Sequence, residues 1–459
     1  MKSEPAIPRT RVYLALILVF GLVLRFFDLV QASAIEMDGV AYARIADHFV
    51  HGAFGQALHD VFSPFYPVLI GIAYFLVPDL EVAGRCVSLL FGMLLICLCY
   101  AFFKRMLGEK KALYGAFFVA IHPYLVQYSA LVLSESLATF LFVAAVFLFY
   151  KGWTEERGVP LAISGFLIAL TYLTRPEYIV YYVPFALLLF ARKRIMHTAL
   201  FLSSPAVLAA LYIGYLRLQT GLWIVSNKAT SSPFVALTTG VTNIPAVAYH
   251  LCAALFPPFL LLLILGFRGI DRQYRNLLIT LLVFHVLSLA LVGHSTRRYS
   301  VEFVPLLLLF CAQGAAVAKD FLRRYRHGLF LSLALTLLLI AICLQPRTVA
   351  LEQKRAAEKQ AGLFMRDHAP GKTIAARLPL VSFYSKGRWV QIPDSDCLFR
   401  DCTTTGVFLQ AERADYFVLD DKLQKVCPGL SACLTLFPII ADFKNRDGFV
   451  RIYRLTDSD

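Results

Sequence analysis

The chain has 459 residues, of which 59% are hydrophobic and only 16% are charged, and its mean hydropathy is +0.67. A soluble domain is usually ~45–50% apolar with ~25% charged residues, so this composition excludes an ordinary soluble protein. The net charge of +14 comes from Lys and Arg residues that cluster in short links between apolar blocks. Such clusters are typical of the cytoplasmic loops of a membrane protein, and no basic helix carries base-reading chemistry, which argues against nucleic-acid binding.

Taken in chain order, the apolar blocks predict about eleven transmembrane helices, since a span takes ~20 residues. They cover 12–31, 84–103, 112–127, 133–150, 161–174, 178–191, 198–217, 246–266, 276–293, 299–318 and 328–344. The run 64–77 is also apolar, but it is short and contains Pro64 and Pro67, so we do not count it as a span. With the N-terminus inside, this choice puts every basic cluster in the cytoplasm, as the positive-inside rule requires.

The first link, 32–83, is then a large external loop, with a helix expected near 38–51 and an in-plane or re-entrant helix at 64–77. The triplet Ala32-Ser33-Ala34 resembles a signal-peptidase site, but Arg25 and Asp28 interrupt the apolar run before it, and we expect an uncleaved first helix. The sequence thus predicts an all-α polytopic membrane domain over 1–344 and a small external α/β domain over 345–459.

The tail carries the pattern of a compact α/β module. A charged helical stretch (349–368) precedes four strand-like runs: Thr373–Ala376, Trp389–Ile392, Tyr416–Leu419 and Phe449–Leu455. In an oxidising compartment its four cysteines are most simply read as two local disulfides, Cys397–Cys402 and Cys427–Cys433. A four-cysteine zinc site is the alternative, although the spacings are not the usual C-x2-C.

Ionisable residues near membrane depth are costly, and each is a candidate functional group. In the predicted topology they gather at the external rim: Glu36, Asp38, His59, Asp60, Glu135, Arg175, Glu177, His294, Arg297, Arg298 and Tyr299. Carboxylates suit proton abstraction from a hydroxyl, and arginines suit phosphate, because the guanidinium binds it bidentately. Taken singly, each has a structural alternative: a rim arginine that contacts lipid headgroups, or a carboxylate that caps a helix.

The order of these motifs resembles the glycosyltransferase-C superfamily, in particular its protein O-mannosyltransferase and aminoarabinose-transferase-like branch. The resemblance is carried by Asp38-Gly-Val-Ala-Tyr42, Ser63-Pro-Phe-Tyr-Pro67, Arg85 leading a span that ends in Phe103-Lys-Arg-Met-Leu-Gly108, Glu135, Arg175, and Arg298-Tyr299 before Pro305. It covers about the first 320 residues and is strongest over 25–180. The sequence departs from the family at Gly39, where members often have Glu, and at Phe62 and Ser63, where some have Glu-Lys.

The resemblance implies transfer of a sugar from a polyprenyl-phosphate carrier to a lipid, glycan or protein acceptor on the external face. Our hypothesis makes Asp38 the general base, with inversion at the anomeric carbon, and gives Glu135 the role of orienting substrate or helping to bind a cation. Arg175, Arg297 and Arg298 would hold the carrier phosphate, and Tyr42 and Tyr299 would line the substrate site. A divalent cation is a candidate cofactor, with Glu36, His59 and Asp60 as candidate ligands.

Three other functions stay open at this point. A lipid flippase or transporter would normally show internal repeats and polar residues at the midplane, and the chain shows neither clearly. A polysaccharide polymerase or ligase would use a lipid-diphosphate donor, and a scaffold would not depend on the rim carboxylates. We expect the chain in a bacterial inner membrane, with the site and the tail in the periplasm.

Overall fold

The computed structural model describes residues 9–58, 61–223, 233–292, 296–344, 349–392, 402–445 and 448–455. By its internal contacts the chain forms two compact units. Unit 1 comprises residues 1–27 and 42–345, and unit 2 comprises residues 28–41 and 346–459. The short segment between α1 and the start of α2 therefore belongs with the C-terminal residues.

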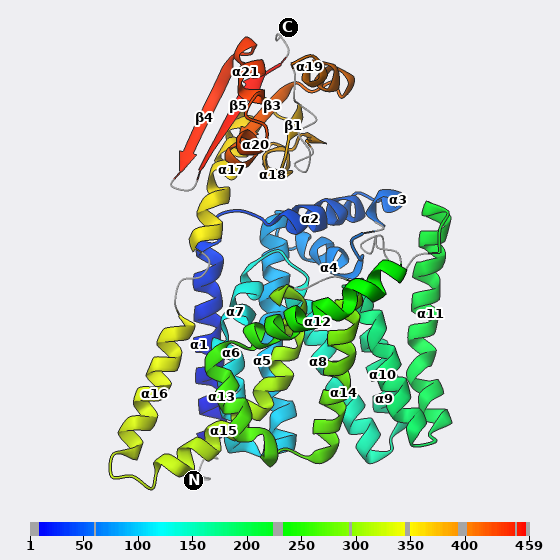
Figure 1. Cartoon of the computed structure of the whole chain (residues 1–459), viewed down its shortest axis with the longest axis vertical. Coiled ribbons are helices and arrows are strands. Elements are labelled where there is room, and N and C mark those ends of the chain that lie inside the picture. The colour runs from blue at the N-terminus through cyan, green and yellow to red at the C-terminus, as the bar shows by residue number, and fades with distance from the viewer. Residues whose placement is uncertain are drawn as a thin grey trace, which may run out of the picture. The chain divides into compact units, whose positions relative to one another are not determined.

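Unit 1 is built from helices (Figure 1). Along the chain these are α1 (Arg9–Gln31), α2 (Met37–Val50), α3 (Phe54–Ala57), α4 (Phe65–Tyr74), α5 (Leu80–Leu107), α6 (Glu109–Ile121), α7 (Pro123–Ala130), α8 (Glu135–Glu155), α9 (Gly158–Tyr172), η1 (Pro176–Tyr181), α10 (Tyr182–Ala191), α11 (Ile195–Thr220), α12 (Pro233–Leu255), α13 (Pro257–Gly266), η2 (Phe267–Gly269), α14 (Arg272–Val292), η3 (Arg297–Phe303), α15 (Val304–Leu322) and α16 (Gly328–Cys343). The last residues of α1 and the first of α2 lie in unit 2.

Six of the described helices are long and apolar enough to cross a membrane, or seven if the bent pair α12 and α13 counts as one span. Long apolar residues such as Leu16, Phe27 and Leu211 are exposed on them, which is the surface that hydrocarbon requires. The chain is thus an integral membrane protein of predominantly helical fold, and the count of about eleven spans stays a prediction. The run 64–77 contains only the ten-residue helix α4, too short for a span of ~20 residues.

The helices of unit 1 share one apolar core. α8 packs against α9 and α5, α11 packs against α9, and α13 packs against α15. The last pair is close because both helices present glycine: a Cβ on Gly314 would lie 1.9 Å from the carbonyl oxygen of Leu262, and one on Gly266 would lie 2.0 Å from that of Phe310. Small residues allow such backbone approach between helices in a membrane.

Unit 2 contains a five-stranded sheet with the order β2-β1-β3-β5-β4. Its elements are α17 (Val349–His368), β1 (Thr373–Ala376), α18 (Leu380–Tyr384), β2 (Arg388–Gln391), α19 (Cys402–Ala411), β3 (Tyr416–Asp420), α20 (Asp421–Val426), α21 (Leu430–Cys433), η4 (Leu434–Leu436), β4 (Ile439–Asn445) and β5 (Gly448–Arg454). β1 pairs in parallel with β2 and β3, whereas β5 pairs antiparallel with β3 and β4.

Alternation along the strands gives this sheet two apolar faces. Ile374 and Val418 pack with Ala361 of α17 on one face, and Ala375 and Phe417 pack with α19 to α21 on the other. The strand-like runs of the sequence correspond to β1, β2, β3 and β5. β4 was not predicted, because it lies at the sheet edge and its pattern is interrupted by Asp442, Lys444 and Asn445.

Cys427 and Cys433 are both in disulfide bonds, so their sulfurs are not the free thiolates that a zinc site needs. Cys397 lies outside the described residues, and the predicted pairings stay predictions.

Candidate active site

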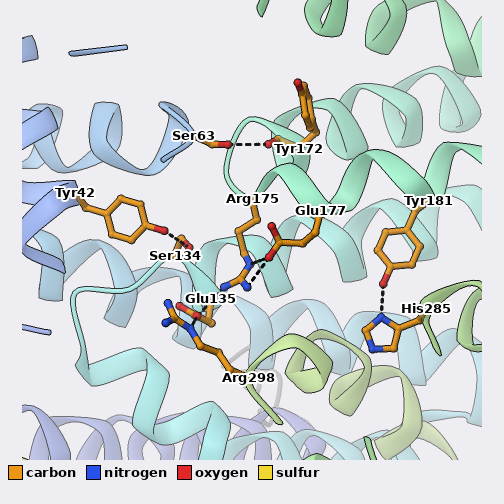
Figure 2. Close-up of polar contacts among 10 residues, drawn as sticks. All are labelled: Tyr42, Ser63, Ser134, Glu135, Tyr172, Arg175, Glu177, Tyr181, His285 and Arg298. Atoms are coloured by element: carbon orange, nitrogen blue, oxygen red, sulfur yellow. Dashed lines mark hydrogen bonds and ion pairs between the residues drawn. The ribbon is translucent and has the colours of Figure 1, made fainter. Parts of the chain in front are cut away.

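Glu135 is the centre of a buried cluster of charges in unit 1. Its carboxylate is 3% exposed and accepts a hydrogen bond of 2.7 Å from Nη1 of Arg175 on Oε1. Nε of Arg298 donates to the same oxygen, and Arg175 also donates to Glu177, with 2.7 Å between Nε and Oε1 (Figure 2). Two arginines and two carboxylates, contributed by α8, the α9–η1 turn and η3, thus form one network.

Local sequence explains how these side chains reach one another. Glu135 is the first residue of α8, where a helix dipole favours a negative charge. Arg175 precedes Pro176, and the residue before a proline is restricted to extended conformations. Its φ of −147° and ψ of 116° end the α9 turn, and the next helical turn, η1, brings Glu177 back onto the guanidinium.

The network is electrostatically favourable for Arg175, which is 5% exposed. Burial by itself lowers the pKa of Arg175, but Glu177 and Glu135 outweigh burial and hold the pKa well above its ordinary value. Oε2 of Glu135 is buried and accepts no hydrogen bond from the described residues. A buried carboxylate oxygen without a donor is costly, which makes Oε2 a natural acceptor for a ligand hydroxyl or cation.

Tyr42 reaches the same cluster from α2. Its hydroxyl and that of Ser134, the residue before Glu135, lie 3.0 Å apart in a hydrogen bond (Figure 2). The ring of Tyr42 packs edge-on against Phe62 and Tyr66, with centroids 5.3 and 5.1 Å apart. Tyr42 therefore lies beside the acidic start of α8, and its role in substrate binding stays a prediction.

The proline-aromatic motif lies against the end of α9. The backbone N–H of Phe65 donates to the carbonyl of Leu173 (2.9 Å), and the Ser63 hydroxyl donates to that of Tyr172 (3.3 Å). The two acceptors, Tyr172 and Leu173, lie shortly before Arg175 in the sequence. Motifs separated by about a hundred residues in the sequence thus meet around one turn.

The three consecutive residues Arg297, Arg298 and Tyr299 separate in space. Arg298 bonds to Glu135, and the ring of Tyr299 lies 5.3 Å from the guanidinium carbon of Arg175. Arg297 is exposed and points to Tyr124, to whose hydroxyl it donates at 2.5 Å. Only two of the three predicted phosphate-binding arginines, Arg175 and Arg298, therefore contact Glu135.

Asp38 lies in the first turn of α2, in the part of the chain that belongs to unit 2. Asp38 and Tyr42 are four residues apart in one helix, so the two side chains share a face of α2. The assignment of Asp38 as general base stays a proposal.

Of the three candidate metal ligands, only Glu36 lies within the described residues, and it forms an ion pair with Arg355. His59 and Asp60 lie outside the described residues, as does the rim residue His294. No group of three or more His, Cys, Asp or Glu side chains among the described residues is arranged to hold a metal ion. Oε2 of Glu135 would supply one ligand, which is too few for a stable site. We therefore derive no step through a metal.

Two buried polar groups near the cluster were not predicted as site residues. Glu302 is 6% exposed and lies within electrostatic reach of Arg175. His285 lies between the hydroxyls of Tyr181 (2.7 Å, Nδ1) and Ser300 (3.1 Å, Nε2) (Figure 2). The sequence did carry a signal for both residues, because Glu302 lies inside the apolar block 299–318 and His285 inside the block 276–293. An ionisable residue inside such a block is a functional candidate by default.

Comparison with known proteins fits this arrangement. Residues 62–223 match the sequence model of the dolichyl-phosphate-mannose-protein mannosyltransferase family. The comparison with curated proteins found no match. Among solved structures, apo ArnT from Cupriavidus metallidurans has a TM-score of 0.65 at 14% identity, covering 97% of this chain and 98% of that one.

Two further structures share the fold. ArnT from the same organism bound to undecaprenyl phosphate has a TM-score of 0.63 at 14% identity, with coverages of 95% and 97%. The oligosaccharyltransferase of Archaeoglobus fulgidus in complex with zinc and sulfate has a TM-score of 0.58 at 14% identity, covering 92% of this chain and 69% of that one. The matched family segment contains Glu135 and Arg175 of the charged cluster. Together with the shared fold, it supports the resemblance to the glycosyltransferase-C superfamily that the sequence motifs carry.

Proposed function

We propose that the chain is a membrane glycosyltransferase that moves a sugar from a polyprenyl-phosphate carrier to an acceptor hydroxyl. The observation that carries the proposal is the convergence of Arg175 and Arg298 on one oxygen of Glu135, whose other oxygen has no hydrogen-bond donor among the described residues. The mannosyltransferase match and the fold shared with an undecaprenyl-phosphate-bound protein support a lipid-phosphate donor. The membrane is a bacterial inner membrane in this proposal, and the site faces the periplasm.

Cations are what a phosphate leaving group needs. When the bond between the anomeric carbon and the phosphate oxygen breaks, negative charge develops on that oxygen, and fixed guanidinium groups stabilise it. Each guanidinium has five N–H donors in a rigid fork, so one arginine can bond to a carboxylate and a phosphate together. Arg175 and Arg298 take this role, and Arg297, exposed beside Tyr124, attracts the phosphate as it enters.

The acceptor hydroxyl attacks the anomeric carbon from the side opposite the phosphate, so a single displacement inverts its configuration. Asp38 accepts the hydroxyl proton as the new carbon–oxygen bond forms, and the products are the glycosylated acceptor and polyprenyl phosphate. Only one base is required, because the phosphate monoester leaves without needing a proton. Oε2 of Glu135 accepts a hydrogen bond from a substrate hydroxyl and thereby orients it.

The test measures transfer of radiolabelled sugar from a panel of synthetic polyprenyl-phosphate sugars to cell-envelope acceptors by purified protein. Wild type and Asp38→Asn are run together, with Asp79→Asn as the matched control, because Asp79 caps the start of α5 and has no proposed chemical role. Transfer by wild type and by the control, but not by Asp38→Asn, supports the class and the base. Transfer by Asp38→Asn at the wild-type rate overturns the base assignment, and no transfer from any donor overturns the function.

A further inference from the structure

A large cavity of unit 1 lies between α1, α6, α13, α15 and α16. Its volume is about 1310 Å³. Figure 1 shows α16 beside α1 and α13, at the end of the unit where the described chain begins. The cavity is lined mainly by aliphatic and aromatic side chains, among them Leu16, Phe117, Leu261 and Leu339. Its body is therefore suited to hydrocarbon.

The charged side chains that line this cavity in the described structure are Arg9, Lys110 and Lys319, and all three are basic. Nζ of Lys319 donates to the Tyr114 hydroxyl at 2.8 Å, which holds the ammonium group at the wall. The carboxylates adjacent in sequence to two of these residues do not line the cavity: Glu109, beside Lys110, forms an ion pair with Lys104, and Asp320 follows Lys319. The polar edge of the cavity is thus positively charged.

The size and the chemistry of the cavity together indicate the class of ligand. Pockets for small metabolites usually measure about 300–1,000 Å³ and combine apolar walls with several convergent polar groups. This cavity is larger, and its charged groups are confined to three basic residues. An apolar body with a basic edge complements a lipid with an anionic headgroup, and basic pockets between transmembrane helices bind such headgroups.

The cavity lies across the membrane from the Glu135 cluster. η3 and α15 together connect the two regions. Arg298 lies in η3, which leads directly into α15 at Val304, and Lys319 lies in the last turn of α15. The 21 residues from Arg298 to Lys319 span about 30 Å at about 1.5 Å per residue, which is the thickness of the hydrocarbon core. A headgroup held by Lys319 therefore belongs to the opposite leaflet, which the charge distribution predicts to be cytoplasmic.

We propose that this cavity is a binding site for an anionic glycerophospholipid of the leaflet opposite the Glu135 cluster. The phosphodiester lies beside Lys110, Lys319 and Arg9, and an acyl chain occupies the apolar space between α1 and α16. The proposal does not depend on the chemistry of sugar transfer.

The site is tested by titrating delipidated full-length protein in detergent with phosphatidylglycerol or with phosphatidylcholine of identical acyl chains. Native mass spectrometry counts the bound lipid. The double variant Lys110→Gln/Lys319→Gln is compared with Arg268→Gln/Arg272→Gln, which removes two exposed basic residues that do not line the cavity. We expect the first variant to lose about tenfold or more in phosphatidylglycerol affinity, since each basic residue contributes about fivefold. The affinity of the first variant for phosphatidylcholine should equal that of wild type, and the control variant should keep the wild-type affinity for phosphatidylglycerol.

Equal affinity of wild type for the two lipids overturns the proposal, as does an equal loss in both double variants, because either result describes unspecific annular lipid. Displacement of phosphatidylglycerol by a lower concentration of undecaprenyl phosphate would identify the carrier as the occupant and also overturn it. The variant Leu335→Trp keeps every charge and fills part of the apolar space, because Leu335 lines the cavity. It should reduce phosphatidylglycerol binding while leaving the thermal unfolding temperature within a few degrees of wild type.

Discussion

Arg355 of α17 forms an ion pair with Glu36, the residue just before α2. The carbonyl oxygen of Glu36 accepts a hydrogen bond from Val40 in the first turn of the helix (2.9 Å). One residue earlier, the N–H of Ile35 donates to the hydroxyl of Tyr384 at 2.8 Å. Arg355 and Tyr384 of unit 2 therefore hold the segment that leads into α2, which starts one residue before the proposed base Asp38.

Loss of this ion pair should loosen the start of α2. We expect Arg355→Met to increase amide exchange over residues 32–41 and to lower kcat for sugar transfer by up to about fivefold, since a partly exposed ion pair contributes up to about 1 kcal/mol. Hydrogen exchange and kinetics on the same preparation measure both effects. The charge-exchanged pair Glu36→Arg/Arg355→Glu should recover part of the loss, and unchanged exchange over 32–41 in Arg355→Met would contradict a positioning role.

The neighbours Arg298 and Arg297 offer a matched comparison. Arg298→Gln should reduce kcat/KM for the lipid-phosphate donor on the order of 100-fold, because truncating one partner of a buried charge network costs about 2–5 kcal/mol. Arg297→Gln removes an exposed cation on Tyr124 and should cost less than about tenfold, with an effect that disappears at high salt. Equal losses in the two variants would show that the contact with Glu135 does not distinguish the two arginines.

Glu135 should be a stabilising residue as well as a candidate for substrate contact. Glu135→Ala leaves the buried Arg175 and the partly exposed Arg298 without their shared partner, and we expect it to lower the free energy of unfolding by about 3–5 kcal/mol. Glu155→Ala, which removes a more exposed partner of Arg105, should cost less than about 1 kcal/mol. Thermal unfolding in the same detergent compares them, and similar losses would mean that burial of the cluster contributes little.

Glu358 in α17 should make unit 2 sensitive to pH. Burial of its carboxyl group, to 8% exposed, raises its pKa to about 7, and the nearby Asp420 adds to the shift, while Arg355 and Arg377 oppose it. Because the folded-state pKa exceeds the unfolded value of about 4.3, folding takes up a proton between these values. The stabilising effect of the protonated group is complete below about pH 4.3 and is lost as pH rises through about 7.

Proteolysis of the full-length protein at pH 5.5 and pH 8 measures this effect on unit 2. Wild type should become more susceptible at pH 8, by up to about 2 kcal/mol in the free energy of opening. Glu358→Gln, which is neutral at both values, should lose most of this dependence. Glu412→Gln, a more exposed carboxylate of the same unit, is the control and should behave as wild type. A pH dependence retained in Glu358→Gln would assign it to another group.

Local patterns in the sequence predicted much of this fold. The tail strands follow from short apolar runs, since a strand in a sheet covered on both faces needs apolar residues in both directions, as in Tyr416–Asp420. The short helix α4 follows from the prolines that bound it. The acidic start of α8 and the Thr-Arg-Pro-Glu turn were also recognisable as site candidates, because both place ionisable residues at the ends of apolar blocks.

The sequence by itself determined that the chain crosses a membrane and that its polar residues gather at the ends of apolar blocks, because hydrocarbon excludes ionised groups along most of a span. Only the tertiary structure decided which of these residues meet. Arg297 and Arg298 are equivalent in sequence, but successive residues in a 3₁₀ helix project about 120° apart, so one contacts Glu135 and the other Tyr124. Glu36 and Arg355 are 319 positions apart, and no local pattern could pair them, because their contact depends on how the chain returns to α2.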